Sequence, residues 1–190
     1  KFLSLYDELK DIDTTSWTTY YKVDMHIVKA EMNGYDFNYR VLRPWVRDPA
    51  FYQTIWMYES DVPAHEGPTN HALLEFWQYD FPLNKQDAQK MAYELEVIPK
   101  LLFQARGNLT GNARDLWVAG IENFKDQEKN ILYIREKIRD EHGKKFDKFL
   151  KKPIEKALKA NKEFLDWLIT KEPSKNGPSG IGKENYSWYQ

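Results

Sequence analysis

Apolar side chains recur every three or four positions along most of the chain, which is the spacing of one face of an α-helix. The first such stripe lies within residues 16–33 and consists of Tyr20, Val23, Ile27 and Ala30. Gly34 follows where a glycine often ends a helix, and Thr14 or Ser16 could cap the start. His26 lies beside the stripe without a second ligand four positions on, so we interpret it as an ordinary helix histidine.

Three longer helices are expected in the second half of the chain. Asn84 is a good N-cap for the first of them. Its stripe consists of Ala88, Met91, Leu95, Ile98 and Leu102. Pro99 lies inside this stripe, so we expect a kink near residues 95–99. The second helix is expected from about Ala113 to Glu141, and the third from about Lys144 to Thr170.

The segments between these stripes contain the helix breaks. Asp48 followed by Pro49 predicts a helix start. The face expected after it is aromatic and aliphatic, with Phe51, Tyr52, Ile55 and Trp56. Residues 61–83 are rich in Pro and predict irregular structure, within which residues 70–77 could form a short helix. Residues 171–190 are expected to form a flexible Gly/Pro-containing turn and an aromatic tail.

The pattern as a whole predicts an all-α fold. Strict two-residue alternation over the length of a strand is nearly absent. We therefore expect a bundle of long antiparallel helices with short irregular connections and no substantial sheet. Residues 1–190 would form a single helical domain or the N-terminal part of a larger helical protein.

Composition excludes several classes of protein. The net charge is −1, which gives no reason to expect binding to nucleic acid. Cysteine is absent, which excludes disulfides, thiol catalysis and cysteine-based zinc sites. The sequence contains no run of 18 apolar residues, so no transmembrane segment is expected. The chain begins without an initiator Met, and we expect it to start inside a longer gene product.

The stretch "PAHEGPTNH" looks like the start of a zinc-protease motif. In H-E-x-x-H, two histidines four apart on a helix bind one metal, and the glutamate acts on the bound water. Here His71 follows His65 by six positions, which is about 240° around a helix rather than on the same face. The Gly-Pro pair after Glu66 also interrupts a helix. We therefore considered His65, Glu66 and His71 as metal ligands and rejected them.

Lysines dominate one part of the last long helix. Eight of them lie between Lys144 and Lys162, together with only two acids, Asp147 and Glu155. Such a stripe could contact phosphate or acidic lipid, but no Arg or aromatic side chain is interleaved with it. We interpret it as a solvated helix face.

Three separate stretches resemble the bacterial domain-of-unknown-function 885 family. They read "VLRPWVRDPAFY" (41–52), "VIPKLLFQARGNLTGNARDLW" (97–117) and "PSGIGKENYSWYQ" (178–190). Their order and spacing also match, and the resemblance covers nearly the whole chain. Members of that family resemble helical, gluzincin-type zinc metallopeptidases of several hundred residues that are often exported or lipid-anchored.

The resemblance implies a non-catalytic role for this chain. The family's zinc motif reads like H-E-x-x-P-G-H-H and lies beyond the part that this chain resembles. No window here matches it, so no metal ligand or catalytic glutamate is assigned, and zinc is expected only in the parent protein. The chain alone is predicted inactive, and its partner would be the C-terminal catalytic portion. The resemblance also implies a periplasmic or lipid-anchored location at the bacterial envelope, with a cytoplasmic one left open.

Two groups of residues are candidates for contact with a peptide substrate or a partner. The first group combines aromatic and polar side chains after two glycines, and consists of Lys183, Asn185, Tyr186, Trp188 and Tyr189. The second is Arg106 and Asn108, for which helix capping is an alternative interpretation. The aromatic side chains could instead dock on the catalytic portion. In that case apolar surface would be exposed near the C-terminus, and Trp188 would not be fully buried.

The function expected from these observations is one wall of a peptide-binding cleft in a predicted bacterial zinc metallopeptidase. The excess of aromatic residues supports an alternative, an independent helical module of the bacterial envelope that binds peptide or glycan. A structural or oligomerising helical unit is a third possibility.

Overall fold

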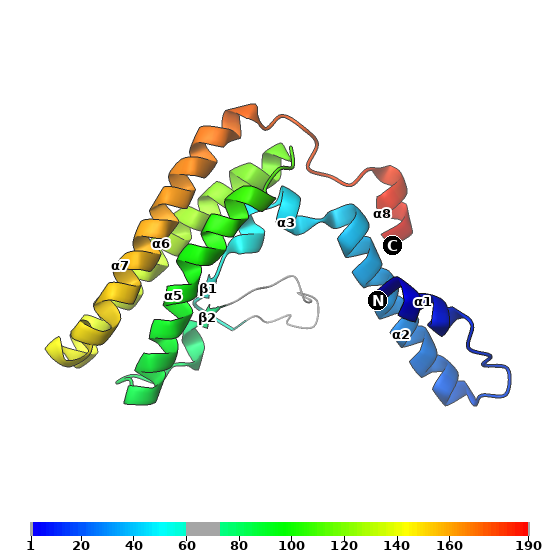
Figure 1. Ribbon diagram of the computed structural model, residues 1–190, viewed down its shortest axis with the longest axis horizontal. Coiled ribbons are helices and arrows are strands. Elements are labelled where there is room, and N and C mark those ends of the chain that lie inside the picture. The colour runs from blue at the N-terminus through cyan, green and yellow to red at the C-terminus, as the bar shows by residue number, and fades with distance from the viewer. Residues whose placement is uncertain (1, 60–72, 190) are drawn as a thin grey trace. The chain divides into compact units, whose positions relative to one another are not determined.

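The computed structural model describes residues 2–59 and 73–189, and most of these residues are helical (Figure 1). They form two compact units. Unit 1 comprises Lys1–Arg43 and Ile181–Gln190, and unit 2 comprises Pro44–Gly180. The only strands in the described residues are two of two residues each. The expected all-α fold class is therefore confirmed.

Unit 1 contains α1 (Phe2–Lys10), α2 (Thr19–Phe37) and α8 (Lys183–Tyr189). The expected end of α2 at Gly34 is wrong, because the helix continues to Phe37 and then into a π-helical turn, Asn38–Leu42. A glycine permits a left-handed helix end but does not impose one. The N-cap is Thr18 rather than Thr14 or Ser16, and its side chain makes no capping hydrogen bond.

The helix α1 packs on one side of α2. Tyr6 donates its hydroxyl hydrogen to Asn33 Oδ1, and the rings of Phe2 and Tyr35 lie 4.9 Å apart. The predicted apolar stripe of α2 is not part of this contact, since Tyr20, Val23, Ile27 and Ala30 are exposed. The spacing therefore predicts the helix correctly, but the striped face is not buried in unit 1.

Unit 2 begins with short elements: α3 (Pro44–Arg47) and a 3-10 turn (Pro49–Tyr52). Asp48 Oδ1 accepts a hydrogen bond from Ala50 N at 2.9 Å, so Asp48 caps this turn as predicted. The turn is followed at once by β1 (Ile55–Trp56), so the helix expected across Phe51–Trp56 lasts only one turn. Backbone pairing with the next strand is the competing interaction at this point.

The strand β1 pairs in parallel with β2 (Leu74–Glu75), and a 3-10 turn (Phe76–Gln78) follows. In the register, Ile55 lies opposite Leu74 and Trp56 opposite Glu75. The short helix expected at residues 70–77 is wrong for residues 73–77, which form this strand and turn. Residues 70–72 lie outside the described part of the chain.

Three long helices form the bundle of unit 2: α5 (Lys85–Asn108), α6 (Arg114–His142) and α7 (Lys144–Lys171). They run side by side, with α7 packed against both others (Figure 1). Asn84 Oδ1 accepts a hydrogen bond from Asp87 N at 2.9 Å, which confirms the predicted cap of α5. The helix is continuous through Pro99, and the expected kink stays a prediction.

The apolar stripes of the three helices meet in one core. Its fully buried members from α5 include Met91, Leu95, Ile98 and Leu102, and those from α6 and α7 include Trp117, Phe124, Ile131, Ile134, Ile154, Phe164 and Leu168. A 3-10 turn, Glu172–Ser174, follows α7 and leads into the segment that returns to the start of α6.

Candidate functional site

The predicted aromatic tail is a helix. Gly182, with a φ of 83°, precedes α8, and Tyr186 N donates to Gly182 O at 3.0 Å. Asn185 Nδ2 donates to Ile181 O at 2.8 Å, so this candidate contact residue fixes the first turn of α8. Within the Gly/Pro-containing turn and aromatic tail expected over residues 171–190, Lys183–Tyr189 form the helix α8.

Trp188 lies against α2. Its ring stacks on Phe37 with the centroids 4.7 Å apart and the planes 10° from parallel. Trp188 nevertheless remains 54% exposed and Tyr186 55% exposed, which confirms the expected apolar surface near the C-terminus. Lys183 is also exposed. The side chain of Tyr189 lies outside the described part. Lys183, Tyr186 and Trp188 therefore keep exposed surface in unit 1.

Asn108 serves a structural contact in unit 2. Its Nδ2 donates to the hydroxyl oxygen of Tyr52 at 2.9 Å, and that hydroxyl donates to Trp45 O at 2.8 Å. Tyr52 is buried, and burial raises the pKa of its hydroxyl. The chain of hydrogen bonds ties the end of α5 to α3. Neither capping nor substrate contact is needed to explain Asn108.

Arg106 is less well explained. The Nε of Arg106 is buried and has no hydrogen-bond partner among the described residues. A buried donor without a partner costs about 1–3 kcal/mol. We have no structural account of it, so Arg106 remains a candidate contact residue.

Segments from three distant parts of the chain meet where α6 begins, and we call this contact the α6 junction. Asn112 connects it to the segment after α7, because its Oδ1 accepts from Asn176 N at 2.7 Å and from Gly177 N at 3.1 Å. Its Nδ2 donates to Asn176 Oδ1 at 2.9 Å. A Cβ added to Gly177 would lie 2.1 Å from Asn112 O, so only glycine fits there.

The α6 junction also includes α3. Arg47 Nη2 donates to Ser179 O at 2.8 Å and to Gly180 O at 3.2 Å. Gly111 N donates to Val46 O at 2.8 Å. The first backbone amides of α6 are used as well, since Asp115 N donates to Ser179 Oγ at 2.8 Å. Because these donors are occupied by the chain itself, the start of α6 is not a free anion site.

Lys175 closes the junction from the side of α7. Its Nζ donates to Gly111 O at 2.7 Å and lies 4.1 Å from the centre of the Trp117 ring. Burial lowers the pKa of the Lys175 amine, and the charge of Lys171 lowers it further. The ammonium is held by a carbonyl and an aromatic face, which is a stabilising arrangement.

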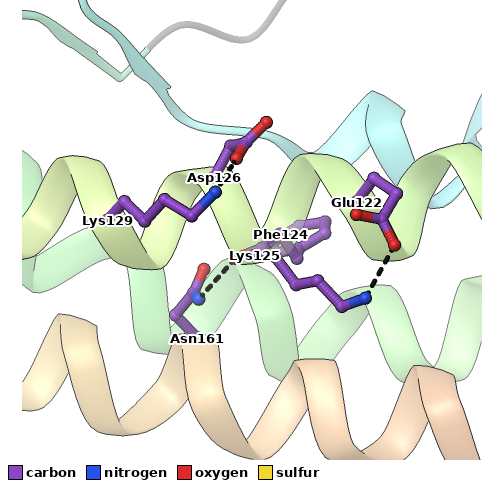
Figure 2. A network of polar contacts seen from close by, with 6 residues as sticks. All are labelled: Glu122, Phe124, Lys125, Asp126, Lys129 and Asn161. Carbon is purple, nitrogen blue, oxygen red and sulfur yellow. Dashed lines mark hydrogen bonds and ion pairs between the residues drawn. The ribbon is translucent and has the colours of Figure 1, made fainter.

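A buried polar network inside the bundle was not predicted from the sequence. Gln127 Oε1 accepts from Thr54 N at 2.8 Å and from Ile55 N at 3.2 Å. Its Nε2 donates to Asn161 Oδ1 at 2.9 Å, and Asn161 Nδ2 donates to Phe124 O at 3.0 Å. Figure 2 shows Asn161 of α7 reaching the backbone of α6 at Phe124, with exposed ion pairs nearby on α6.

A signal for this network is present in the sequence. Gln127 lies three residues after Phe124 and four before Ile131, so it occupies a position of the apolar stripe. Asn161 likewise lies between Ala157 and Phe164 on the stripe of α7. A polar residue at an apolar position of a buried helix predicts a hydrogen-bonded partner inside the core. The partner itself could not be identified from spacing.

Tyr79 and Glu94 form a second polar contact that the sequence did not indicate. The Tyr79 hydroxyl donates to Glu94 Oε2 at 2.5 Å, and Lys90 Nζ lies 3.8 Å from Glu94 Oε1. Burial raises the pKa of the Glu94 carboxyl, against the lowering effects of Tyr79 and Lys90, while Glu75 raises it. Burial and the Glu94 carboxyl together raise the pKa of Tyr79.

Groups that could bind a metal and helices that could span a membrane were both searched for in the described part of the chain. No group of three or more His, Asp or Glu side chains there could hold a metal ion. The rejected ligands His65, Glu66 and His71 lie outside the described residues. No helix in residues 2–59 and 73–189 is long and apolar enough to cross a membrane.

The lysines of α7 are partly paired, Lys156 with Glu96 and Lys159 with Glu163.

Comparison of the chain with protein-family models, with curated proteins and with solved structures finds no match. The resemblance of residues 41–52, 97–117 and 178–190 to a family therefore remains an expectation from the sequence.

Proposed function

We propose that this chain is a non-catalytic helical part of a bacterial protein of the zinc-metallopeptidase type, in which it forms one wall of a peptide-binding cleft. One observation carries the proposal. The three stretches that resemble the family meet at the α6 junction, where Val46 and Arg47, Gly111 to Asp115, and Ser179 and Gly180 are joined by hydrogen bonds. A chance resemblance would not be expected to select three distant segments that contact one another.

The peptide contacts are assigned to α8. Lys183 offers a charge, and Tyr186 and Trp188 offer half-exposed rings on a short helix whose first turn is fixed by Asn185. Aromatic side chains supply large contact area at a small cost in conformational entropy, which suits weak binding of an extended peptide. The catalytic portion, with its zinc ion, is the partner that would complete the cleft.

Peptide binding and catalysis are tested separately. Fluorescence anisotropy with a mixture of labelled unstructured peptides should show binding that Tyr186→Ala weakens. Tyr93→Ala, which removes an exposed tyrosine of unit 2, is the matched control and should leave binding unchanged. Equal effects of the two variants, or no binding at all, would contradict the assignment to α8.

The absence of catalysis is tested with zinc. The purified chain, incubated with Zn²⁺, should cleave no peptide. Stoichiometric zinc binding with chelator-sensitive hydrolysis would overturn the proposal and restore His65, Glu66 and His71 as candidate ligands.

A binding module of the bacterial envelope is the second candidate function. The exposed aromatic side chains of unit 1 favour it, among them Tyr20, Tyr21, Tyr35 and Tyr39. Soluble fragments of cell-wall glycan distinguish the two functions. Binding of glycan but not of peptide, lost in Tyr20→Ala or Tyr39→Ala, would favour the module.

Export to the envelope belongs to both proposals and is checked by fractionation of cells that produce the full gene product.

A further inference from the structure

The exposed face of α2 has the pattern of a coiled-coil seam. Tyr20 is 73% exposed, Val23 50% and Ile27 56%, and Ala30 and Gly34 continue the same face. These positions alternate at spacings of three and four residues, which is the spacing of the a and d positions of a heptad repeat. Tyr20, Ile27 and Gly34 are then a positions, and Val23 and Ala30 are d positions. An isolated exposed apolar side chain needs no explanation, but a continuous exposed stripe marks an interaction surface.

Unit 1 lacks a substantial core of its own. Among its described residues, only Met25 and Phe37 are buried apolar side chains. Phe37 is the next d position of the repeat and is already covered by the Trp188 ring, so the free seam ends at Gly34. A unit this small gains stability by burying its apolar face against another element.

Charges beside the seam indicate which partner fits. The e positions are Asp24 and Glu31, and the g positions are Thr19, His26 and Asn33, all of them beside the apolar stripe. In a parallel pair, each g residue meets the e residue five positions later on the other helix. His26 then meets Glu31 of the second copy, and Thr19 meets its Asp24. No like charges face each other.

The alternative arrangements are disfavoured by the same charges. In an antiparallel pair the e positions face each other, which places Asp24 against Glu31 of the second copy. A membrane surface is disfavoured because the polar residues of α2 show no basic surplus: Lys22 and Lys29 are outnumbered by Asp24, Glu31 and Asp36.

We propose that α2 pairs in parallel with α2 of a second copy of this chain, with Tyr20, Val23, Ile27, Ala30 and Gly34 in the seam. The pairing is independent of the proposed peptide contact on α8. The seam is short, so association is expected with a dissociation constant on the order of 10 µM, weaker than that of a standard-sized interface.

The first test compares two neighbouring substitutions on the same helix. Sedimentation equilibrium of the wild-type chain should show a dimer at concentrations above about 10 µM. Ile27→Glu, at an a position, should weaken association at least about tenfold, because it places a charge in the apolar seam. Val28→Glu, on an exposed residue at a b position, should leave association unchanged. Circular dichroism checks that both variants keep their helices.

The second test reads the orientation of the helices. The chain has no cysteine, so a single introduced thiol reports one contact. Val23→Cys should form a disulfide between copies under mild oxidation, because d positions face each other in a parallel pair. Val28→Cys is the control, with nearly the same exposure, 46% against 50%, and should remain a free thiol.

The third test exchanges the flanking charges. Glu31→Lys should weaken the dimer, and the double variant His26→Glu with Glu31→Lys should restore it, because a complementary g to e pair forms again. A merely destabilising effect of Glu31→Lys would not be reversed in this way.

Four results would overturn the proposal. They are a monomer up to several hundred micromolar, equal effects of Ile27→Glu and Val28→Glu, failure of Val23→Cys to cross-link, and failure of the double variant to restore association. If the chain is a monomer but Ile27→Glu lowers its melting temperature, the seam is covered within the same molecule. Flotation with neutral phosphatidylcholine vesicles would instead identify a lipid surface.

Discussion

Gln127 is a buried polar side chain whose loss is expected to be costly. It is fully buried and satisfies the backbone amides of Thr54 and Ile55 while donating to Asn161. Gln127→Leu keeps the volume roughly constant but leaves these groups unpaired, so we expect a loss of about 2–4 kcal/mol in the free energy of unfolding. Urea denaturation measures it. Lys129→Ala, which removes an exposed ion pair of α6 with Asp126, should leave the free energy of unfolding nearly unchanged, because solvent screens the pair.

Glu94 makes stability depend on pH. Burial is the main reason that its folded-state pKa lies above the ordinary value, so the folded state binds the proton more readily than the unfolded chain. The stabilising contribution is present below the unfolded-state pKa and is lost as the pH rises through the folded-state pKa. Glu94→Gln keeps an oxygen that accepts the hydrogen bond from the Tyr79 hydroxyl. The variant cannot ionise, so it does not lose stability as the pH rises.

Thermal unfolding of wild type and Glu94→Gln between pH 4 and pH 7 checks the sign. The variant should gain stability relative to wild type as the pH rises. Glu96→Gln, at a half-exposed carboxylate of the same helix, is the control. A gain for Glu94→Gln that is largest at pH 4 would contradict the assignment.

At the scale of elements, the contact between α6 and the turn that begins at Pro49 depends on a glycine. A Cβ added to Gly120 would lie 2.6 Å from the Cβ of Pro49, so Gly120→Ala forces the turn away from the helix. We expect a net loss of about 1–3 kcal/mol, although alanine has the higher helix propensity. Gly107→Ala is the matched control, because nothing lies within 4 Å of its added Cβ. It should be neutral or slightly stabilising.

At the scale of the whole molecule, the two units differ in how much apolar surface they bury. Nearly all buried apolar side chains of the described residues belong to unit 2, and unit 1 has Met25 and Phe37. Local opening should therefore cost less in unit 1. In hydrogen exchange, the amides of α2 should exchange at least about tenfold faster than those of α5, α6 and α7 under conditions where the chain is monomeric. Equal protection would mean that unit 1 is stabilised by a contact outside it.

Predictions of structure from the sequence were correct where local signals and burial agree. The caps at Asn84 and Asp48 need only neighbouring residues, and both are present. Prediction failed where a distant segment competes with local propensity: the aromatic helix after Pro49 gives way to β1 because residues near 74 supply a strand partner. Of the candidate contact residues, Asn108 proved to have a structural partner that lies 56 positions earlier in the chain, which no spacing rule reveals.

The sequence by itself determined α2, α5, α6 and α7, because a stripe with a period of three to four residues depends on the local chain alone. Only the tertiary structure decided which stripes are buried: those of α5, α6 and α7 form the core, whereas that of α2 is exposed, although all were equally regular in the sequence. It also decided that residues 46–47, 111–115 and 179–180 meet at one junction. The physical reason is that burial is a property of pairs of surfaces, and the sequence of one helix does not specify what packs against it.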